Sequence, residues 1–165
     1  MNEAIEGASY QDVNQKNKCL TGKGLTQQST NLAEGIHAVD QLLEETGAWD
    51  RLVEGHPEIC FQAFADEPLR HSKKTAPGVD ERLNALESTN EYQAGDWRPV
   101  ARQLRDDDYV AGLDDVLDAI VLAVTACAIE GEDLQTLPSS PEKYNRGRPM
   151  QMVYRRSEPF DAITE

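Results

Sequence analysis

Three acidic residues stand at the start of the longest apolar stretch of the chain. Asp114 and Asp115 precede it, and Asp118 lies inside it. An ionised carboxylate is costly to bury, so the position of Asp118 inside an apolar run needs an explanation. One interpretation is a helix start, with Asp115 as the N-cap and Asp118 in the first turn, where the helix dipole favours negative charge.

A second interpretation, compatible with the first, is an acid or metal site at the mouth of this helix. Asp115 and Asp118 share a helix face at a spacing of three residues, and Asp114 and Asp118 share one at a spacing of four. Carboxylates this close together can bind one hard cation. The pattern alone leaves the choice open, because a capping carboxylate can also be a ligand.

The element that positions these acids is a helix predicted over residues 115–128. Leu113, Leu117, Ile120 and Val124 recur at helical spacing, and a second set of apolar residues from Val116 to Cys127 does the same. Apolar residues on almost every side indicate a helix buried in the core. The stretch is too short, and too acidic at its start, to span a bilayer.

A second group of acids follows a predicted short strand over residues 51–54. The His56-Pro57 pair ends this strand, and Glu58 begins the next element. Glu54 therefore lies near a strand end, which is where α/β folds place their chemistry. The alternative is that Glu54 is a solvated residue at the edge of a sheet.

Positive charge is sparse, and its densest spot is Lys73-Lys74 in a predicted loop. Paired lysines can contact a phosphate backbone, although ordinary surface charge explains them equally well. Lys23 lies between two glycines in a turn that can offer backbone N–H groups to an anion. A plain glycine-rich turn into a helix is the alternative, and the spacing of a phosphate-binding P-loop is absent.

The remaining elements follow from periodicity and from breaker residues. We expect residues 1–20 to form a loosely held loop and residues 156–165 a polar tail. The other predicted elements are an amphipathic helix over 27–46, a helix over 78–88, a helix from Trp97 through Leu104, a solvated acidic loop at 106–108 and a strand over 150–154.

The composition is strongly acidic, with 30 Asp and Glu against 16 Lys and Arg and a net charge of -14. This charge opposes non-specific binding to nucleic acid. A halophilic origin explains it, since an acidic surface stays hydrated in a high-salt cytoplasm; the net charge then says little about the ligand. The 3 cysteines form no CxxC pair, and no signal peptide or membrane span is found, which favours a cytoplasmic protein with reduced thiols.

Three of these stretches, taken in order, resemble one family. They are Thr21–Gln28 with the helix that follows, Glu54–Phe61 with Ser72–Thr75, and Asp114–Ala119. Together they are similar to the domain of unknown function 429, a family of predicted nucleases of RNase H-like fold, over residues 10–155. The Glu-x-His-Pro-Glu and Ser-Lys-Lys-Thr pair is the specific part of the match.

The resemblance implies a single α/β domain over residues 1–165, RNase H-like, with helices packed on a small sheet. It implies hydrolysis of phosphodiesters with Mg²⁺ or Mn²⁺ as cofactor and nucleic acid as partner. The catalytic and metal-binding acids would be Glu54, Asp115 and Asp118, with Glu58 as an extra. The residues that contact substrate phosphate would be Lys73, Lys74 and Lys23.

The chain departs from the family pattern in two respects. The opening β-hairpin, whose first strand carries an Asp in a Val-Asp-Gly context, has no counterpart here, so we expect an N-terminally truncated domain. Gly55 also stands where family members have an apolar residue. We expect the strand at 51–54 to expose an edge that favours a homodimer. A non-catalytic interaction module of the same fold is the alternative function.

Overall fold

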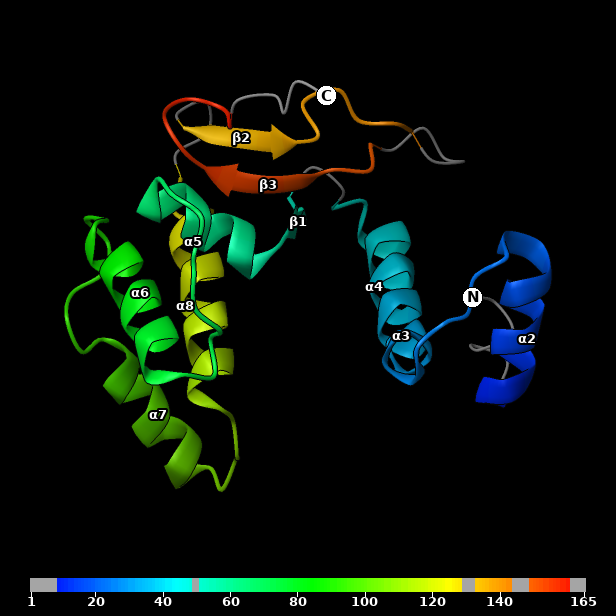
Figure 1. Ribbon diagram of the computed structural model, residues 1–165, viewed down its shortest axis with the longest axis horizontal. Coiled ribbons are helices and arrows are strands. Elements are labelled where there is room, and N and C mark those ends of the chain that lie inside the picture. Colours follow the sequence, from blue (N-terminus) through cyan, green and yellow to red (C-terminus); the bar gives the residue numbers. More distant parts are fainter. Residues whose placement is uncertain (1–8, 49–50, 129–132, 144–148, 161–165) are drawn as a thin grey trace. The chain divides into compact units, whose positions relative to one another are not determined.

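The computed structural model describes residues 9–48, 51–128, 133–143 and 149–160. The chain divides into two compact units, Met1–Leu52 and Val53–Glu165. The first contains helices alone in its described part, and the second contains helices and a sheet (Figure 1). The expectation that residues 1–165 act as one domain stays a prediction.

The first unit begins with a helix where a loop was expected. Helix α2 spans Tyr10–Thr21, so the prediction for residues 1–20 is wrong from Tyr10 onward. The Ser9 hydroxyl caps it by accepting the N–H of Asp12 at 3.3 Å, and the Tyr10 hydroxyl donates to the Leu25 carbonyl at 2.8 Å. Val13 is the one buried residue of this helix, so the cap and the Tyr10 hydrogen bond stabilise it. Such a helix has no apolar stripe by which the sequence could predict it.

The predicted helix over residues 27–46 is interrupted once. Helices α3 (Gln27–Asn31) and α4 (Ala33–Thr46) are separated by Leu32. The end of α4 agrees with the prediction: Gly47 adopts a left-handed conformation with φ 66°, and its N–H donates to the Leu43 carbonyl at 3.0 Å. Glycine enters this region without steric cost, which is why the helix ends there.

The second unit has a small mixed sheet with helices packed on it (Figure 1). The strand order is β1-β3-β2; β1 runs parallel to β3, and β2 runs antiparallel to it. This confirms an α/β protein with a small sheet. The elements are β1 (Glu54–Gly55), α5 (Pro57–Ala65), α6 (Ala76–Glu87), α7 (Trp97–Asp106), α8 (Leu113–Ala126), β2 (Leu134–Leu137) and β3 (Met152–Arg155).

The strands are the least well predicted part. Strand β1 has two residues and starts at Glu54, where the sequence places the end of a strand over 51–54. It lies at one edge of the described sheet, as expected. Strand β2 was missed, because four residues among prolines and glycines carry too little alternation to be recognised.

Helix α8 forms the centre of the core, as its apolar pattern predicts. Leu117 and Val121 are fully buried in one core cluster with Phe61, Leu86 and Tyr154, and α8 packs against α5, α6 and α7. One face of α8 is nevertheless exposed, and it carries the small residues Ala119, Ala123 and Ala126. Alanine supports the helix without requiring burial, so the helix needs partners on fewer sides than its composition suggests. No described helix is long and apolar enough to cross a membrane.

The three cysteines differ in accessibility, and this difference gives a first test of the core. Cys60 lies in the core, where burial raises the pKa of its thiol; its Sγ donates to the Val153 carbonyl at 3.8 Å. Cys19 and Cys127 are exposed. Since the thiolate is the reactive form, we expect two of the three thiols to react rapidly with a disulfide reagent in the native protein and the third only on unfolding. Fast reaction of a Cys19→Ser, Cys127→Ser variant would contradict this core.

Candidate functional site

The carboxylates at the start of α8 have two different roles. Gly112, in an extended conformation, is the N-cap, and its N–H donates to Asp115 Oδ2 at 3.2 Å. Asp115 is exposed and closes the reciprocal half of a capping interaction. The prediction of Asp115 as the N-cap is therefore wrong by three residues, while its assignment to the helix start is right. Because the helix begins at Leu113, Asp118 lies beyond the first turn, where capping gives it no partner.

Asp118 finds its partner in the loop before α6. Lys73 Nζ donates to Asp118 Oδ2 at 2.5 Å and lies 3.9 Å from Asp114 Oδ2. The two aspartates, four positions apart, share one face of α8 and hold the ammonium between them. The Asp118 side chain is 19% exposed, because its neighbour Leu117 is drawn into the core, and the Lys73 side chain is 31% exposed. The two residues identified separately in the sequence thus meet at one place.

The loop that carries Lys73 is bound tightly to the first turn of α6. Thr75 is the N-cap of α6, and its hydroxyl accepts the N–H of Gly78 at 3.2 Å. The Thr75 N–H and hydroxyl both donate to the Ser72 carbonyl, at 2.9 Å and 2.7 Å. A Cβ on Gly78 would lie 2.0 Å from that carbonyl oxygen, so only glycine permits this approach. These contacts fix the backbone from which Lys73 extends.

A buried arginine joins this loop to α5. Arg82 is 3% exposed, and its Nη2 donates to Glu58 Oε1 and Oε2 at 2.7 Å and 2.6 Å. Its Nη1 donates to the carbonyls of Gly78 at 2.8 Å and His71 at 3.3 Å. The guanidinium carbon also lies 5.6 Å from the centre of the Phe61 ring. Arg82 therefore ties the start of α5, the lysine loop and α6 into one framework.

The charges of this framework act on Lys73. Its pKa is raised, first by the hydrogen bond to Asp118, against desolvation, and then by the negative charges of Asp118, Asp114 and Glu58. A lysine whose pKa is raised in the folded protein is fully charged at every pH well below the ordinary lysine pKa. Lys73 is therefore an ammonium at neutral pH. The influence of Glu58 places that acid in the electrostatic neighbourhood of the lysine.

None of the hydrogen bonds and ion pairs described above involves three further predicted site residues, which are Lys23, Lys74 and Glu54. Lys23 belongs to the first unit, and Lys74 is exposed. A Cβ on Gly55 would lie 2.8 Å from Leu122 Cδ2, so Gly55 is the residue of β1 that faces α8. Adjacent residues of a strand point to opposite faces, which directs the exposed Glu54 side chain away from that helix. The role of Glu54 in catalysis stays a prediction.

Arg82 is the site residue that the sequence analysis missed. Val79, Leu83 and Leu86 define the apolar stripe of α6, and Arg82 follows Val79 by three positions and precedes Leu86 by four. A charged residue on the buried stripe of a helix needs a buried partner. The presence of a charged residue at a position of the apolar stripe could therefore have identified Arg82 from the sequence.

Among the described residues, no group of three or more His, Cys, Asp or Glu side chains is arranged to hold a metal ion. Glu54, Asp115 and Asp118 therefore do not form such a group. Mg²⁺, however, is usually bound through one or two carboxylates, with water and substrate phosphates completing its shell. Asp118 Oδ1 is buried without a hydrogen-bond partner, beside a carboxylate pair that already attracts an ammonium. The Asp114 and Asp118 carboxylates, with Asp118 Oδ1 not hydrogen-bonded, are therefore suitable ligands for a hard cation.

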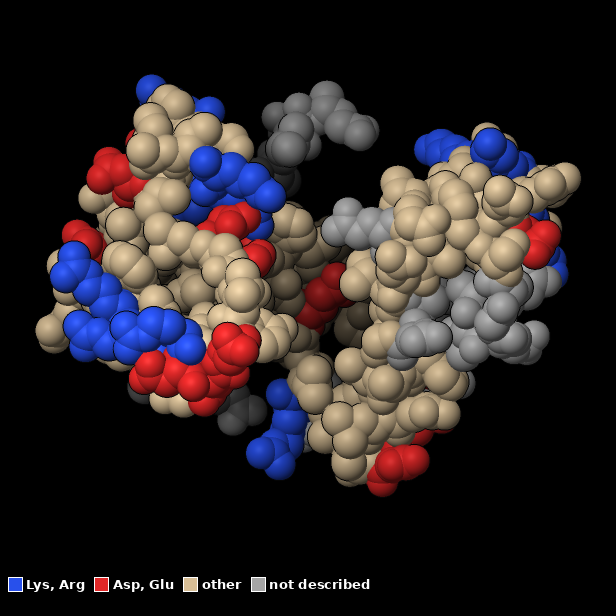
Figure 2. Space-filling view, turned by 90° about the horizontal axis from the view of Figure 1, so that it is seen from below, with Lys and Arg blue, Asp and Glu red and all other residues tan. Residues whose placement is uncertain are grey.

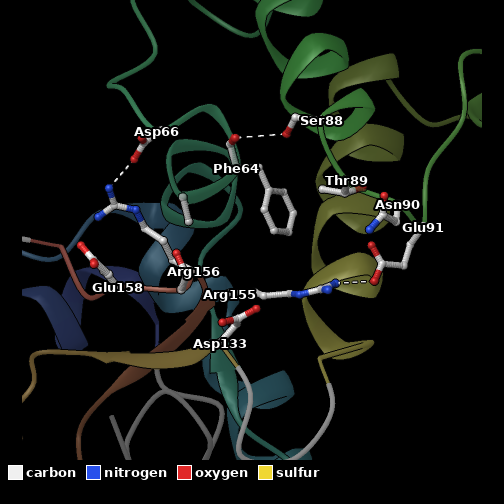
Figure 3. A pocket seen from close by; sticks show the side chains of 12 residues that line it. Phe64, Asp66, Ser88, Thr89, Asn90, Glu91, Asp133, Arg155, Arg156 and Glu158 are labelled. Carbon is white, nitrogen blue, oxygen red and sulfur yellow. Dashed lines mark hydrogen bonds and ion pairs between the residues drawn. The ribbon is translucent and has the colours of Figure 1, made fainter.

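A separate cavity of about 410 Å³ lies where β3 meets the ends of α5 and α6 (Figure 3). Two arginines extend into it, but both are already paired: Arg155 with Glu91 at 2.6 Å, and Arg156 with Asp66. Asp133 and Glu158 add further negative charge to its lining. Since both guanidinium groups already have acidic partners, we expect this cavity to bind an anionic ligand more weakly than its two arginines suggest.

The fold and the site define an α/β protein with a carboxylate pair bridged by a lysine from a conformationally fixed loop. The model of the family described as Protein of unknown function (DUF429) matches residues 1–143, and the chain belongs to that family. No curated protein and no solved structure matches the chain.

Proposed function

We propose that this chain is a metal-dependent nuclease domain of RNase H-like fold that acts on phosphodiesters at the Asp114–Asp118 pair. The observation that carries the proposal is the short contact between Lys73 and Asp118, whose second carboxylate oxygen is buried without a partner. Among the described residues, Arg82 Nε and the Tyr92 hydroxyl are also buried without a hydrogen-bond partner, but of these atoms only Asp118 Oδ1 belongs to a carboxylate that can ligate a hard cation.

In this proposal, Asp118 and Asp114 hold Mg²⁺ or Mn²⁺. When bound, the cation would position a water and neutralise charge on the reacting phosphate. Lys73 and Lys74 contact substrate phosphate from the Ser72–Thr75 loop. Glu58, kept in place by Arg82, adds negative charge beside the site.

A nucleic-acid substrate would depend on the bound cation, because the Asp114, Asp118 and Lys73 side chains together carry one net negative charge. On the face that Figure 2 shows, Lys and Arg side chains are interspersed with Asp and Glu side chains. Contact with phosphates would therefore depend on a few lysines and on the bound cation, and would not require a broad basic surface.

Metal binding to purified protein tests the site directly. We expect titration calorimetry to show Mn²⁺ binding to the wild type and no binding to Asp118→Asn, because the substitution removes the charge and keeps the shape. Asp107→Asn, which changes an exposed acid at the end of α7, is the matched control and should bind as the wild type does. Equal binding by Asp118→Asn, or none by the wild type, would reject the site.

A non-catalytic interaction module is the second candidate, and the edge position of β1 favours it. The exposed Val53 adjoins this edge strand, whose outer side pairs with no other strand in the described part of the chain and can accept a strand from a partner or from a second copy. Nicking of plasmid DNA and of labelled RNA with Mn²⁺ distinguishes the two candidates, since the module would show no cleavage by wild type or variants.

A further inference from the structure

The charge balance at the start of α8 is incomplete. Asp114 and Asp118 carry two negative charges, and Lys73 supplies one positive charge within 4 Å of both. Arg82 is bonded to Glu58 and is not the partner of either aspartate. Within residues 9–48, 51–128, 133–143 and 149–160, this leaves one negative charge of the pair unbalanced, and Asp118 Oδ1 is buried there without a hydrogen-bond partner.

We infer that Lys73 is the internal counter-ion of this aspartate pair, that its ammonium and a divalent cation compete for the same carboxylates, and that Lys73 turns to substrate phosphate when the cation binds. The inference rests on the proposed function and adds to it how the site is regulated. It gives the lysine two alternative positions, one in the metal-free protein and one in the loaded protein.

The competition follows from distance. A cation on Asp118 Oδ1 would be separated from Lys73 Nζ, which is 2.5 Å from Oδ2, by only the width of one carboxylate group. A doubly charged cation and an ammonium at such a separation repel each other strongly, because little solvent lies between charges this close. Binding of the cation therefore favours departure of the ammonium.

The lysine is free to leave without rearranging the loop. Its backbone is held by the Thr75 and Ser72 hydrogen bonds, and its flexible side chain is 31% exposed. Only the rotatable stem must move to bring the ammonium into solvent, where an anionic phosphate can meet it. A lysine that served only to hold Asp118 in place would instead make the site weaker when removed.

These two roles predict opposite effects of Lys73→Met on metal affinity. We expect the variant to bind Mn²⁺ about tenfold more tightly than the wild type in titration calorimetry, since a competing positive charge is lost. Lys74→Met removes an exposed neighbouring charge that is not bonded to either aspartate, and it should leave the affinity close to that of the wild type. Unchanged or weaker binding by Lys73→Met would overturn the inference.

The outcomes also separate this inference from the proposed function. If the wild type binds Mn²⁺, Asp118→Asn does not, and Lys73→Met binds no more tightly, the metal site stands and the competition is wrong. If no variant binds, the metal site itself is wrong, and the inference falls with it. Binding by Lys73→Met alone would mean that the wild-type chain does not hold the cation, so it would reject the metal site and the inference with it.

A measurement on the unaltered chain avoids any effect of substitution on folding. Brief acylation of lysine amines, followed by mass spectrometry of peptides, reports how accessible each ammonium is. We expect Mg²⁺ to increase the acylation of Lys73 several-fold, because the ammonium is released from Asp118, and to leave Lys74 unchanged. Unchanged or reduced acylation of Lys73 at saturating Mg²⁺ would overturn the inference.

Discussion

Replacing Arg82 by methionine is expected to lower the free energy of unfolding of the second unit by about 3 kcal/mol, because removing one partner of a buried ion pair leaves the other uncompensated. Methionine keeps an unbranched stem of similar length, so the loss reports the guanidinium group. The carbonyls of Gly78 and His71 lose their donor at the same time. Glu58 is 39% exposed, and water reaching its carboxylate keeps the effect at the lower end of the range for buried pairs.

Urea denaturation measures this effect, with the fluorescence of Trp97 as the signal in a Trp49→Phe background. Arg102→Met, which changes an exposed arginine of α7, is the control and should alter the stability by less than about 0.5 kcal/mol. Equal stability of the Arg82 and Arg102 variants would mean that the contacts between Arg82, Glu58 and the loop are not maintained in solution.

A double-mutant cycle identifies the source of the loss. In Glu58→Gln, Arg82→Met, no carboxylate is left unpaired, so we expect the double variant to be no less stable than Arg82→Met alone. A coupling of about 1–3 kcal/mol between the two positions is expected from groups in direct contact. Additive losses would show that Arg82 acts through packing on Phe61 and not through Glu58.

Gly78→Ala is expected to cost about 2–3 kcal/mol, although alanine is the better helix former. The added Cβ would lie 2.0 Å from the Ser72 carbonyl oxygen and 2.6 Å from its carbon, and these are backbone atoms that cannot rotate away. The loop must therefore shift, and Lys73 must shift with it. Urea denaturation measures the loss, and weakened or altered Mn²⁺ binding would accompany it.

The same substitution at two other glycines provides matched controls. At Gly35 in α4 a new Cβ meets nothing within 4 Å, so Gly35→Ala should stabilise the first unit by about 0.5–1 kcal/mol through helix propensity. At Gly55 it meets Leu122 Cδ2, the end of a flexible side chain, and the cost should be smaller than at Gly78. A Gly78→Ala variant as stable as the wild type would show that the loop does not lie this close to α6.

The sequence predicts some positions of the site and misses others, for reasons that differ residue by residue. Asp118 was identified because an ionised carboxylate within an apolar helix is costly to bury. Its partner, Lys73, was noticed only as a local concentration of positive charge. The two are 45 residues apart, and no periodicity joins them. Arg82 was passed over, because a helical stripe with one charged member still reads as a stripe.

Local patterns were sufficient where the structure depends on local forces. Helical spacing predicted the core helix before Ala128, and a glycine able to adopt a left-handed conformation predicted the helix end at Gly47. Alternation of apolar and polar residues predicted the strand that ends at Arg155. All three elements lie close to their predicted positions. Helix α2 and strand β2 were not predicted, since a single cap or a pairing with β3 stabilises them and neither leaves a pattern in the surrounding residues.

The amino-acid sequence by itself determined that this chain is an acidic α/β protein with a core helix before Ala128 and an acid, Asp118, inside the apolar stretch of that helix. The tertiary structure alone decided that the Lys73 ammonium pairs with that acid and that Arg82 binds Glu58, whose charge acts on Lys73. It also decided that Gly55, not Glu54, faces α8. The reason is that helical and strand periodicities are set by neighbours along the chain. The pairing of charges depends on which segments are brought together in space, and for Lys73 and Asp118 that is decided by the packing of α6 and α5 against α8.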